Sequence, residues 1–211
     1  MVKISEVNDV YEKAREIFKQ VKKEIESKKF HYNVSEFEKA IQKLVGEYDT
    51  ANWENRFVVG GALEVLFCAL LNSMKFDCKW LKEARYDIEI NNVKFSLKSN
   101  FTGGGDIRLV NILGDKKAIW DEPTLFFISD VGICYADPSM GLPTKHTSDA
   151  LTVKTKDIKE MIEENDEWLI PLSIPRKPTN SAKIKTASFD VAKSILEEIN
   201  SKYLREYLPL L

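Results

Sequence analysis

The sequence predicts an α/β domain, in which helices flank a central mixed β-sheet, from two kinds of periodicity. Apolar and polar residues alternate strictly over 86–99, which is typical of a half-buried β-hairpin. Apolar residues recur at helical spacing over about 5–28 and over 58–70, as in helices that cover a sheet. Three further apolar runs predict strands, at 124–129, 132–136 and 168–174. Pro171 indicates that the last of them is an edge or bulged strand.

Capping signals predict where the other helices begin. Ser35 and Glu38 have the spacing of a capping box, so a second helix is expected from there to about Gly46. Another helix is expected near 156–164. A C-terminal helix is predicted from Phe189 to about Tyr207, with the preceding serine as its N-cap.

The hairpin brings polar groups to one face. If Asn91-Asn92 form a two-residue turn, Asp87 lies directly opposite Ser96 on the neighbouring strand. Lys98 then lies diagonal to Asp87. A carboxylate, a hydroxyl and an ammonium group would therefore be neighbours, while the other face stays apolar and can be buried.

Two further charges share this face. Glu89 lies opposite Lys94, and we expect the two to form an ion pair, with Glu89 as an alternative carboxylate for the site. Charged residues on the outer face of a hairpin are ordinary, so the hairpin alone fits a solvated surface as well as a functional site.

The preceding helix carries an acidic residue in an apolar run. Glu64 lies between Leu63 and Val65, and a carboxylate there is costly unless it meets a cation or a strong donor. This makes Glu64 a candidate metal ligand. Gly60-Gly61 is unfavourable inside a helix and indicates either the close approach of another backbone or a ligand, or a helix that starts near Gly61.

These residues carry a family resemblance. A helix glutamate, an aspartate on a strand and a hairpin strand that ends in SLK resemble the PD-(D/E)XK nuclease superfamily, and within it the type II restriction endonucleases. The match covers about the middle quarter of the chain. Tyr86 stands where the family has proline, and Ser96 replaces the second acidic residue. The continuation SLKSNFTGGGDIRLVN is also similar to restriction enzymes with a glycine-rich loop after the lysine.

The resemblance implies a divalent-metal-dependent endonuclease that hydrolyses phosphodiester bonds in duplex DNA at specific sequences. Phosphodiester hydrolysis needs a hard cation such as Mg²⁺, which takes oxygen ligands from one or two carboxylates and from waters. Asp87 and Glu64 could supply them, and the resemblance adds the main-chain carbonyl of Leu97. Ser96 could hydrogen-bond a bound water, and Lys98 would position the attacking water, act as base or stabilise the developing oxyanion.

The domain and the partners follow from the same expectation. We expect a single nuclease domain over 1–211, with an N-terminal helical region at about 1–50 and a catalytic core at about 54–136. A duplex-cutting enzyme would most simply be a homodimer, and a companion DNA methyltransferase is plausible. The N-terminal helices could cover the sheet, extend a DNA clamp or build the dimer. The resemblance implies products with 5′-phosphate and 3′-hydroxyl ends.

Two alternatives stay open. One is a junction-resolving or repair nuclease of the same superfamily, which recognises DNA structure. The other is a catalytically inactive DNA-binding module, with Ser96 as the sign of lost activity.

The formal net charge of −2 opposes a general affinity for nucleic acid, so DNA contact would need a local basic cleft. Candidates lie in the glycine-rich segment and in a later loop that could equally be a solvated connection. The candidate DNA contacts are Ser99, Asn100, Arg108, Asn111, Arg176, Lys177, Lys183 and Lys185.

The remaining composition argues against other metal chemistry. The three cysteines lack CxxC spacing and lie in apolar contexts, which predicts reduced core thiols. Two isolated histidines do not form a zinc-protease or HNH pattern. The N-terminus has no signal-peptide pattern, and Glu64 interrupts the longest apolar run, so we expect a cytoplasmic protein without a membrane span.

Overall fold

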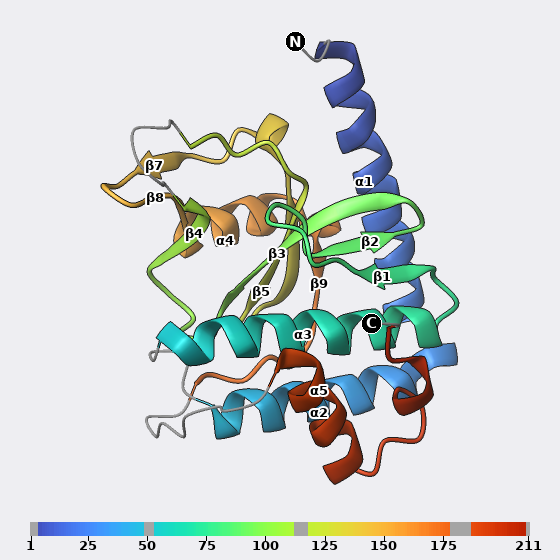
Figure 1. Cartoon of the computed structure of the whole chain (residues 1–211). Coiled ribbons are helices and arrows are strands. Elements are labelled where there is room, and N and C mark those ends of the chain that lie inside the picture. Colours follow the sequence, from blue (N-terminus) through green and yellow to red (C-terminus); the bar gives the residue numbers. More distant parts are fainter. Residues whose placement is uncertain (1–3, 49–52, 112–117, 178–186, 210–211) are drawn as a thin grey trace.

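The computed structural model describes residues 4–48, 53–111, 118–177 and 187–209. Within them the chain forms an α/β fold with a six-stranded mixed sheet in the order β1-β2-β3-β5-β6-β9. A smaller antiparallel sheet has the order β4-β8-β7. Figure 1 shows α2, α3 and α5 grouped on one side of the strands, with α1 rising beside the β1–β3 edge.

The predicted strands are present, and the structure adds others. The larger sheet consists of β1 (Cys78–Trp80), β2 (Ile88–Ile90), β3 (Val93–Asn100), β5 (Thr124–Ile128), β6 (Gly132–Ala136) and β9 (Leu169–Ile170). The smaller sheet consists of β4 (Asp106–Asn111), β7 (Thr144–His146) and β8 (Ala150–Lys154). The strand expected over 168–174 is limited to β9 and ends before Pro171, which cannot donate a ladder hydrogen bond.

The helices are α1 (Ile4–Glu26), α2 (His31–Glu47), α3 (Trp53–Ser73), α4 (Thr155–Glu164) and α5 (Ser188–Glu198). The predicted start of the second helix is wrong. Ser35 lies inside α2, and Glu38 accepts a hydrogen bond from the backbone N–H of Ser173 at 2.7 Å instead of capping its own helix.

The C-terminal helix is shorter than predicted. Ser188 is its first residue and not its N-cap, and the helix ends well before Tyr207. Asn200 adopts a left-handed conformation with φ of 52°, which breaks the helix. The carboxylate of Glu36 on α2 then accepts hydrogen bonds from the hydroxyl of Ser201 and from the backbone N–H groups of Lys202 and Tyr203.

The larger sheet is buried on both faces because two hydrophobic clusters cover it. Leu125 and Phe127 of β5 face the cluster formed with α1, α2, α3 and α5. Phe126 and Ile128 face the other way, into a cluster with β4, β8 and α4. β5 pairs in parallel with β3 and antiparallel with β6, and this central position explains its uninterrupted apolar sequence.

The first cluster is centred on α3. Over Asn55–Ser73 this helix has a mean hydropathy of 1.5, so that by length and composition it could cross a membrane, contrary to the expectation that no segment would pass this test. Two thirds of that window, 67%, is buried inside the fold. The apolar composition of α3 is therefore accounted for by its contacts with α2, α5 and the sheet.

Close packing explains why one of the two adjacent positions 60 and 61 of α3 is a glycine. A Cβ atom on Gly61 would lie 2.5 Å from Oγ and 2.8 Å from Cβ of Ser188, at the start of α5. Gly60 and Gly61 both lie inside α3, so the interpretation that the helix starts near Gly61 is wrong. Another element does approach Gly61 closely, but through the side chain of Ser188 and not through its backbone.

Candidate active site at the end of the β2–β3 hairpin

The hairpin has the register that the sequence predicts. Ile90 pairs with Val93, and Glu89 pairs with Lys94. Both turn residues, Asn91 and Asn92, have positive φ angles of 47° and 67°. This is the conformation of a type I′ turn, whose twist matches that of the two strands.

Asp87 lies just before β2 and is held by three neighbours on β3. Its Oδ2 accepts hydrogen bonds from Oγ of Ser96 at 3.1 Å and from the backbone N–H of Leu97 at 2.5 Å. Nζ of Lys98 lies 3.6 Å from the same oxygen. The carboxylate, hydroxyl and ammonium groups expected to be neighbours are therefore in contact.

Glu64 reaches this cluster from α3. Trp80 on β1 donates a hydrogen bond from its indole Nε1–H to Oε2 of Glu64 at 2.9 Å. Burial and, after it, the negative charge of Asp87 raise the pKa of Glu64 to about 7, while the hydrogen bond from Trp80 and the charge of Lys98 act in the opposite direction. Glu64 therefore interacts electrostatically with both Asp87 and Lys98.

Each of the two carboxylates keeps one oxygen that could bind a small hard cation. Oδ1 of Asp87 and Oε1 of Glu64 accept no hydrogen bond from the part of the chain that the structure describes. The carbonyl of Leu97 points to the same side of β3 as its N–H group, that is, toward Asp87. Among the described residues no cluster has three or more His, Cys, Asp or Glu side chains, so a cation here would rely on two carboxylates, a carbonyl and waters, as Mg²⁺ commonly does.

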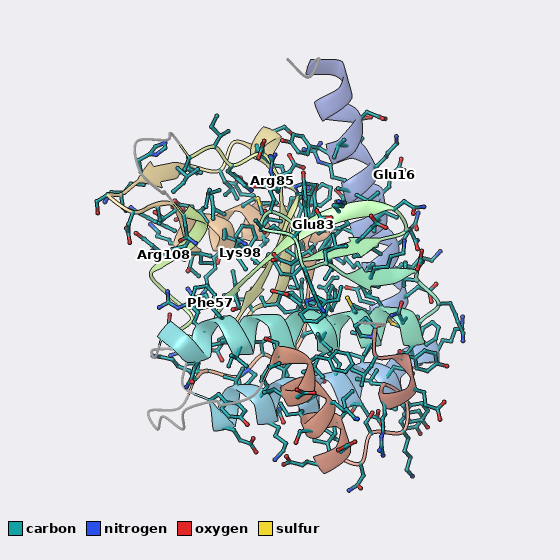
Figure 2. All side chains as sticks on the ribbon, viewed as in Figure 1. Glu16, Phe57, Glu83, Arg85, Lys98 and Arg108 are labelled. Atoms are coloured by element: carbon teal, nitrogen blue, oxygen red, sulfur yellow. The ribbon has the colours of Figure 1, made fainter. Side chains whose placement is uncertain are left out.

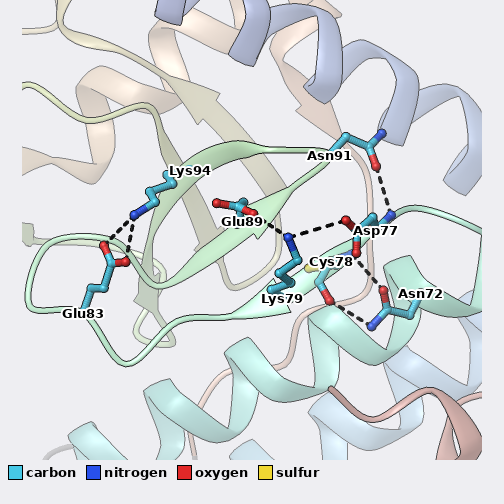
Figure 3. A network of polar contacts seen from close by, with 8 residues as sticks. All are labelled: Asn72, Asp77, Cys78, Lys79, Glu83, Glu89, Asn91 and Lys94. Atoms are coloured by element: carbon cyan, nitrogen blue, oxygen red, sulfur yellow. Dashed lines mark hydrogen bonds and ion pairs between the residues drawn. The ribbon is translucent and has the colours of Figure 1, made fainter. Parts of the chain in front are cut away.

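The expected ion pair between Glu89 and Lys94 is absent, although the two residues are cross-strand partners. Oε1 of Glu89 lies 2.8 Å from Nζ of Lys79 on β1, and Lys94 pairs with Glu83 at 2.7 Å. Figure 3 shows the two pairs on separate sides of the hairpin. The unpredicted strand β1 supplies the competing lysine.

An ion-pair network fixes the segment that leads into Asp87. Arg85 contacts Asp121 and donates a hydrogen bond to Glu122 at 2.8 Å. Glu122 is buried in the connection before β5, and the carbonyl of the following Pro123 accepts a hydrogen bond from the N–H of Ser96. Arg85 thus ties the start of the hairpin to the strand beside the site.

The proposed DNA contacts are dispersed. Arg108 on β4 is exposed and pairs with Asp149 at 2.6 Å, while Asn111 is exposed at the end of the same strand. Ser99 is partly buried on the face of β3 opposite Lys98. Figure 2 shows Arg108 and Lys98 on their separate strands.

Asn100 has a structural role that differs from the expected DNA contact. It is buried, and its Nδ2 donates hydrogen bonds to the carbonyl of Gly104 and to Oγ1 of Thr155, both at 2.8 Å. It therefore holds the glycine-rich loop. Beside this loop, Arg176 pairs with Asp130, and the N–H of Lys177 donates to the carbonyl of Phe101. Lys183 and Lys185 lie outside the described residues.

The role of Trp80 was not predicted from the sequence, although a buried glutamate requires a hydrogen-bond donor and a tryptophan on a nearby strand is a suitable one.

Comparisons with protein-family models, with curated proteins and with solved structures find no match. Any functional conclusion therefore depends on the site itself.

Proposed function

We propose that this chain is a divalent-metal-dependent, sequence-specific DNA endonuclease of the type II restriction kind, with a restriction-endonuclease-like arrangement of its sheet. The observation that carries the proposal is the convergence of Glu64 on α3, Asp87 just before β2, and Lys98 on β3. A carboxylate in contact with a lysine, and a second carboxylate that interacts electrostatically with both, are the elements that phosphodiester hydrolysis needs.

Glu64, Asp87 and the carbonyl of Leu97 would hold the metal ion, for which Mg²⁺ is the best candidate. When bound, Mg²⁺ would neutralise charge on the phosphate and lower the pKa of an attacking water. Burial and, after it, the charge of Asp87 raise the pKa of Glu64 in the protein alone, so a cation held by both carboxylates would favour the charged form of Glu64.

The neighbouring residues orient these groups. Ser96 and the N–H of Leu97 fix Oδ2 of Asp87 and leave Oδ1 for a ligand. Lys98 is only partly exposed, with 25% of its side chain accessible, and its ammonium group is held near Asp87. From there Lys98 can orient a water through a hydrogen bond and stabilise negative charge that develops on the phosphate.

A homodimer would place one such site on each strand of a palindromic duplex. The acidic net charge of the chain is compatible with this, because a sequence-specific enzyme needs positive charge only where DNA lies. A companion DNA methyltransferase would protect the host genome.

Digestion of plasmid and branched DNA tests the proposal. Wild-type protein with Mg²⁺ is expected to give discrete bands, and chelation or the Asp87→Asn substitution is expected to abolish cleavage. Cleavage of branched or damaged DNA alone would instead favour the structure-specific nuclease. Binding without cleavage, unchanged in Asp87→Asn and Lys98→Ala proteins, would favour the inactive binding module.

A further inference from the structure

The two adjacent glycines of α3 have different surroundings. Gly61 is required by the contact with Ser188, but apart from the adjacent residues and the backbone of α3 itself no described atom lies within 4 Å of the position that a Cβ atom on Gly60 would occupy. Glycine is unfavourable inside a helix compared with alanine. The described part of the fold therefore contains no packing reason for glycine at position 60.

Gly60 lies between an exposed aromatic residue and the candidate site. Phe57 precedes it by three residues and Glu64 follows it by four, so the three lie on one face of α3. The side of α3 that leads to the site is open at Phe57, which is 65% exposed. Figure 2 shows Phe57 on the N-terminal part of α3 and Lys98 on β3 above it in this view.

The charge of this surface suits a phosphate backbone. Arg56 is exposed next to Phe57 and forms no ion pair with a carboxylate among the described residues, while Lys98 lies at the other end. Phe57 and Glu64 are seven residues apart, which corresponds to about 10 Å along a helix. That length is about three stacked base steps of a nucleic-acid strand.

We propose that Phe57 and Gly60 form a subsite for the strand that is cut. Phe57 stacks on a base about three steps from the scissile phosphate, and the bare backbone at Gly60 lets the sugar-phosphate chain pass close to α3. This inference rests on the proposed nuclease function. It also implies that the bound DNA is distorted at this point, because an aromatic side chain can stack on a base only where the neighbouring base has been opened or kinked away.

Cleavage rates test the subsite. Phe57→Ala is expected to lower kcat/KM for DNA by about 5- to 150-fold, the range for loss of one stacked base, and Phe57→Trp is expected to keep most of the wild-type kcat/KM. Gly60→Ala is expected to raise the melting temperature and yet lower cleavage. Tyr32→Ala and Gly46→Ala are matched controls on α2, one an aromatic that is 63% exposed and the other a glycine with open space, and both should cut normally.

A binding measurement addresses stacking directly. Duplexes that carry 2-aminopurine at successive positions around the mapped cut are titrated with wild-type protein and chelator. We expect the emission to change about three steps from the cut with wild type and Phe57→Trp, but not with Phe57→Ala.

The outcomes separate the two proposals. Normal cleavage by both Phe57→Ala and Gly60→Ala, or the same 2-aminopurine response with wild type and Phe57→Ala, overturns the subsite and leaves the nuclease intact. If wild type binds DNA without cutting, the nuclease proposal fails, and 2-aminopurine scanned through the whole bound duplex still decides whether Phe57 stacks on a base. A wild type that neither binds nor cuts any DNA overturns both.

Discussion

The indole of Trp80 holds the carboxylate of Glu64 at 2.9 Å, at the point where α3 passes the β1 edge of the sheet. This hydrogen bond orients an acidic group whose neighbours along α3, Leu63 and Val65, are buried in the apolar core. It also acts against the burial that disfavours the charged form of Glu64.

The raised pKa of Glu64 predicts a pH-dependent stability in the absence of divalent ions. The folded protein binds the proton of Glu64 more tightly than the unfolded chain does, with a pKa of about 7 against 4.5. The free energy of unfolding should therefore fall as pH rises from about 4.5 to 7, by about 3 kcal/mol. Glu64→Gln should lose this dependence, as measured by urea unfolding in chelator at several pH values; equal slopes for both proteins would contradict the assignment.

Lys98 is expected to be essential for cleavage and dispensable for folding. Lys98→Ala should lower the rate of DNA hydrolysis by about 100-fold or more, since it removes the ammonium group beside the reacting phosphate. Lys94→Ala is the matched control, because Lys94 lies on the same face of β3 but pairs with exposed Glu83. Single-turnover rates and melting temperatures check this, and similar rates for the two variants would argue against a catalytic Lys98.

Glu89 provides a comparison with Asp87. Both carboxylates belong to the polar face of the hairpin, yet Glu89 is paired with Lys79. Glu89→Gln should leave the Mg²⁺ dependence of cleavage unchanged and alter stability by less than about 1 kcal/mol, whereas Asp87→Asn should abolish cleavage. A metal titration of the cleavage rate decides between them; a weakened Mg²⁺ response in Glu89→Gln would make Glu89 a ligand after all.

Arg15 is predicted to be important for stability alone. Its Nε and one terminal nitrogen donate to Asp137 at 2.8 and 2.9 Å, and Asp137 is fully buried. Arg15→Met leaves this carboxylate without its cation, which should cost about 3 kcal/mol of unfolding free energy. Lys13→Met, which breaks an exposed pair with Asp9, should cost much less, because solvent screens that pair. Denaturant unfolding measures both, and equal losses would show that Asp137 does not depend on Arg15.

The hairpin and its register could be predicted because they depend on local sequence. Alternation, a two-residue turn and the period of two along a strand place Asp87, Ser96 and Lys98 without any tertiary information. The position of Glu64 followed from the cost of a buried carboxylate.

The errors concern interactions between distant segments. Glu89 pairs with Lys79 and not with Lys94, because β1 pairs with the edge of the hairpin. Glu38 does not cap α2, because its carboxylate accepts a hydrogen bond from the N–H of Ser173. The smaller sheet includes β7, whose three residues are all exposed and give no periodicity. The end of α5 depends on the left-handed conformation of Asn200. The apolar residues that follow Asn200 predict instead a helix that continues to about Tyr207.

The turn at Asn91-Asn92 has a consequence for how this site could change. Both residues have positive φ. Asp87 lies four positions before Asn91, and the length of the turn determines which residue of β3 lies opposite Asp87. A substitution or insertion that favours a three-residue loop would exchange Ser96 for a neighbour that points into the core. Activity could thus be lost, or a different side chain recruited, through a mutation that touches none of the reacting groups.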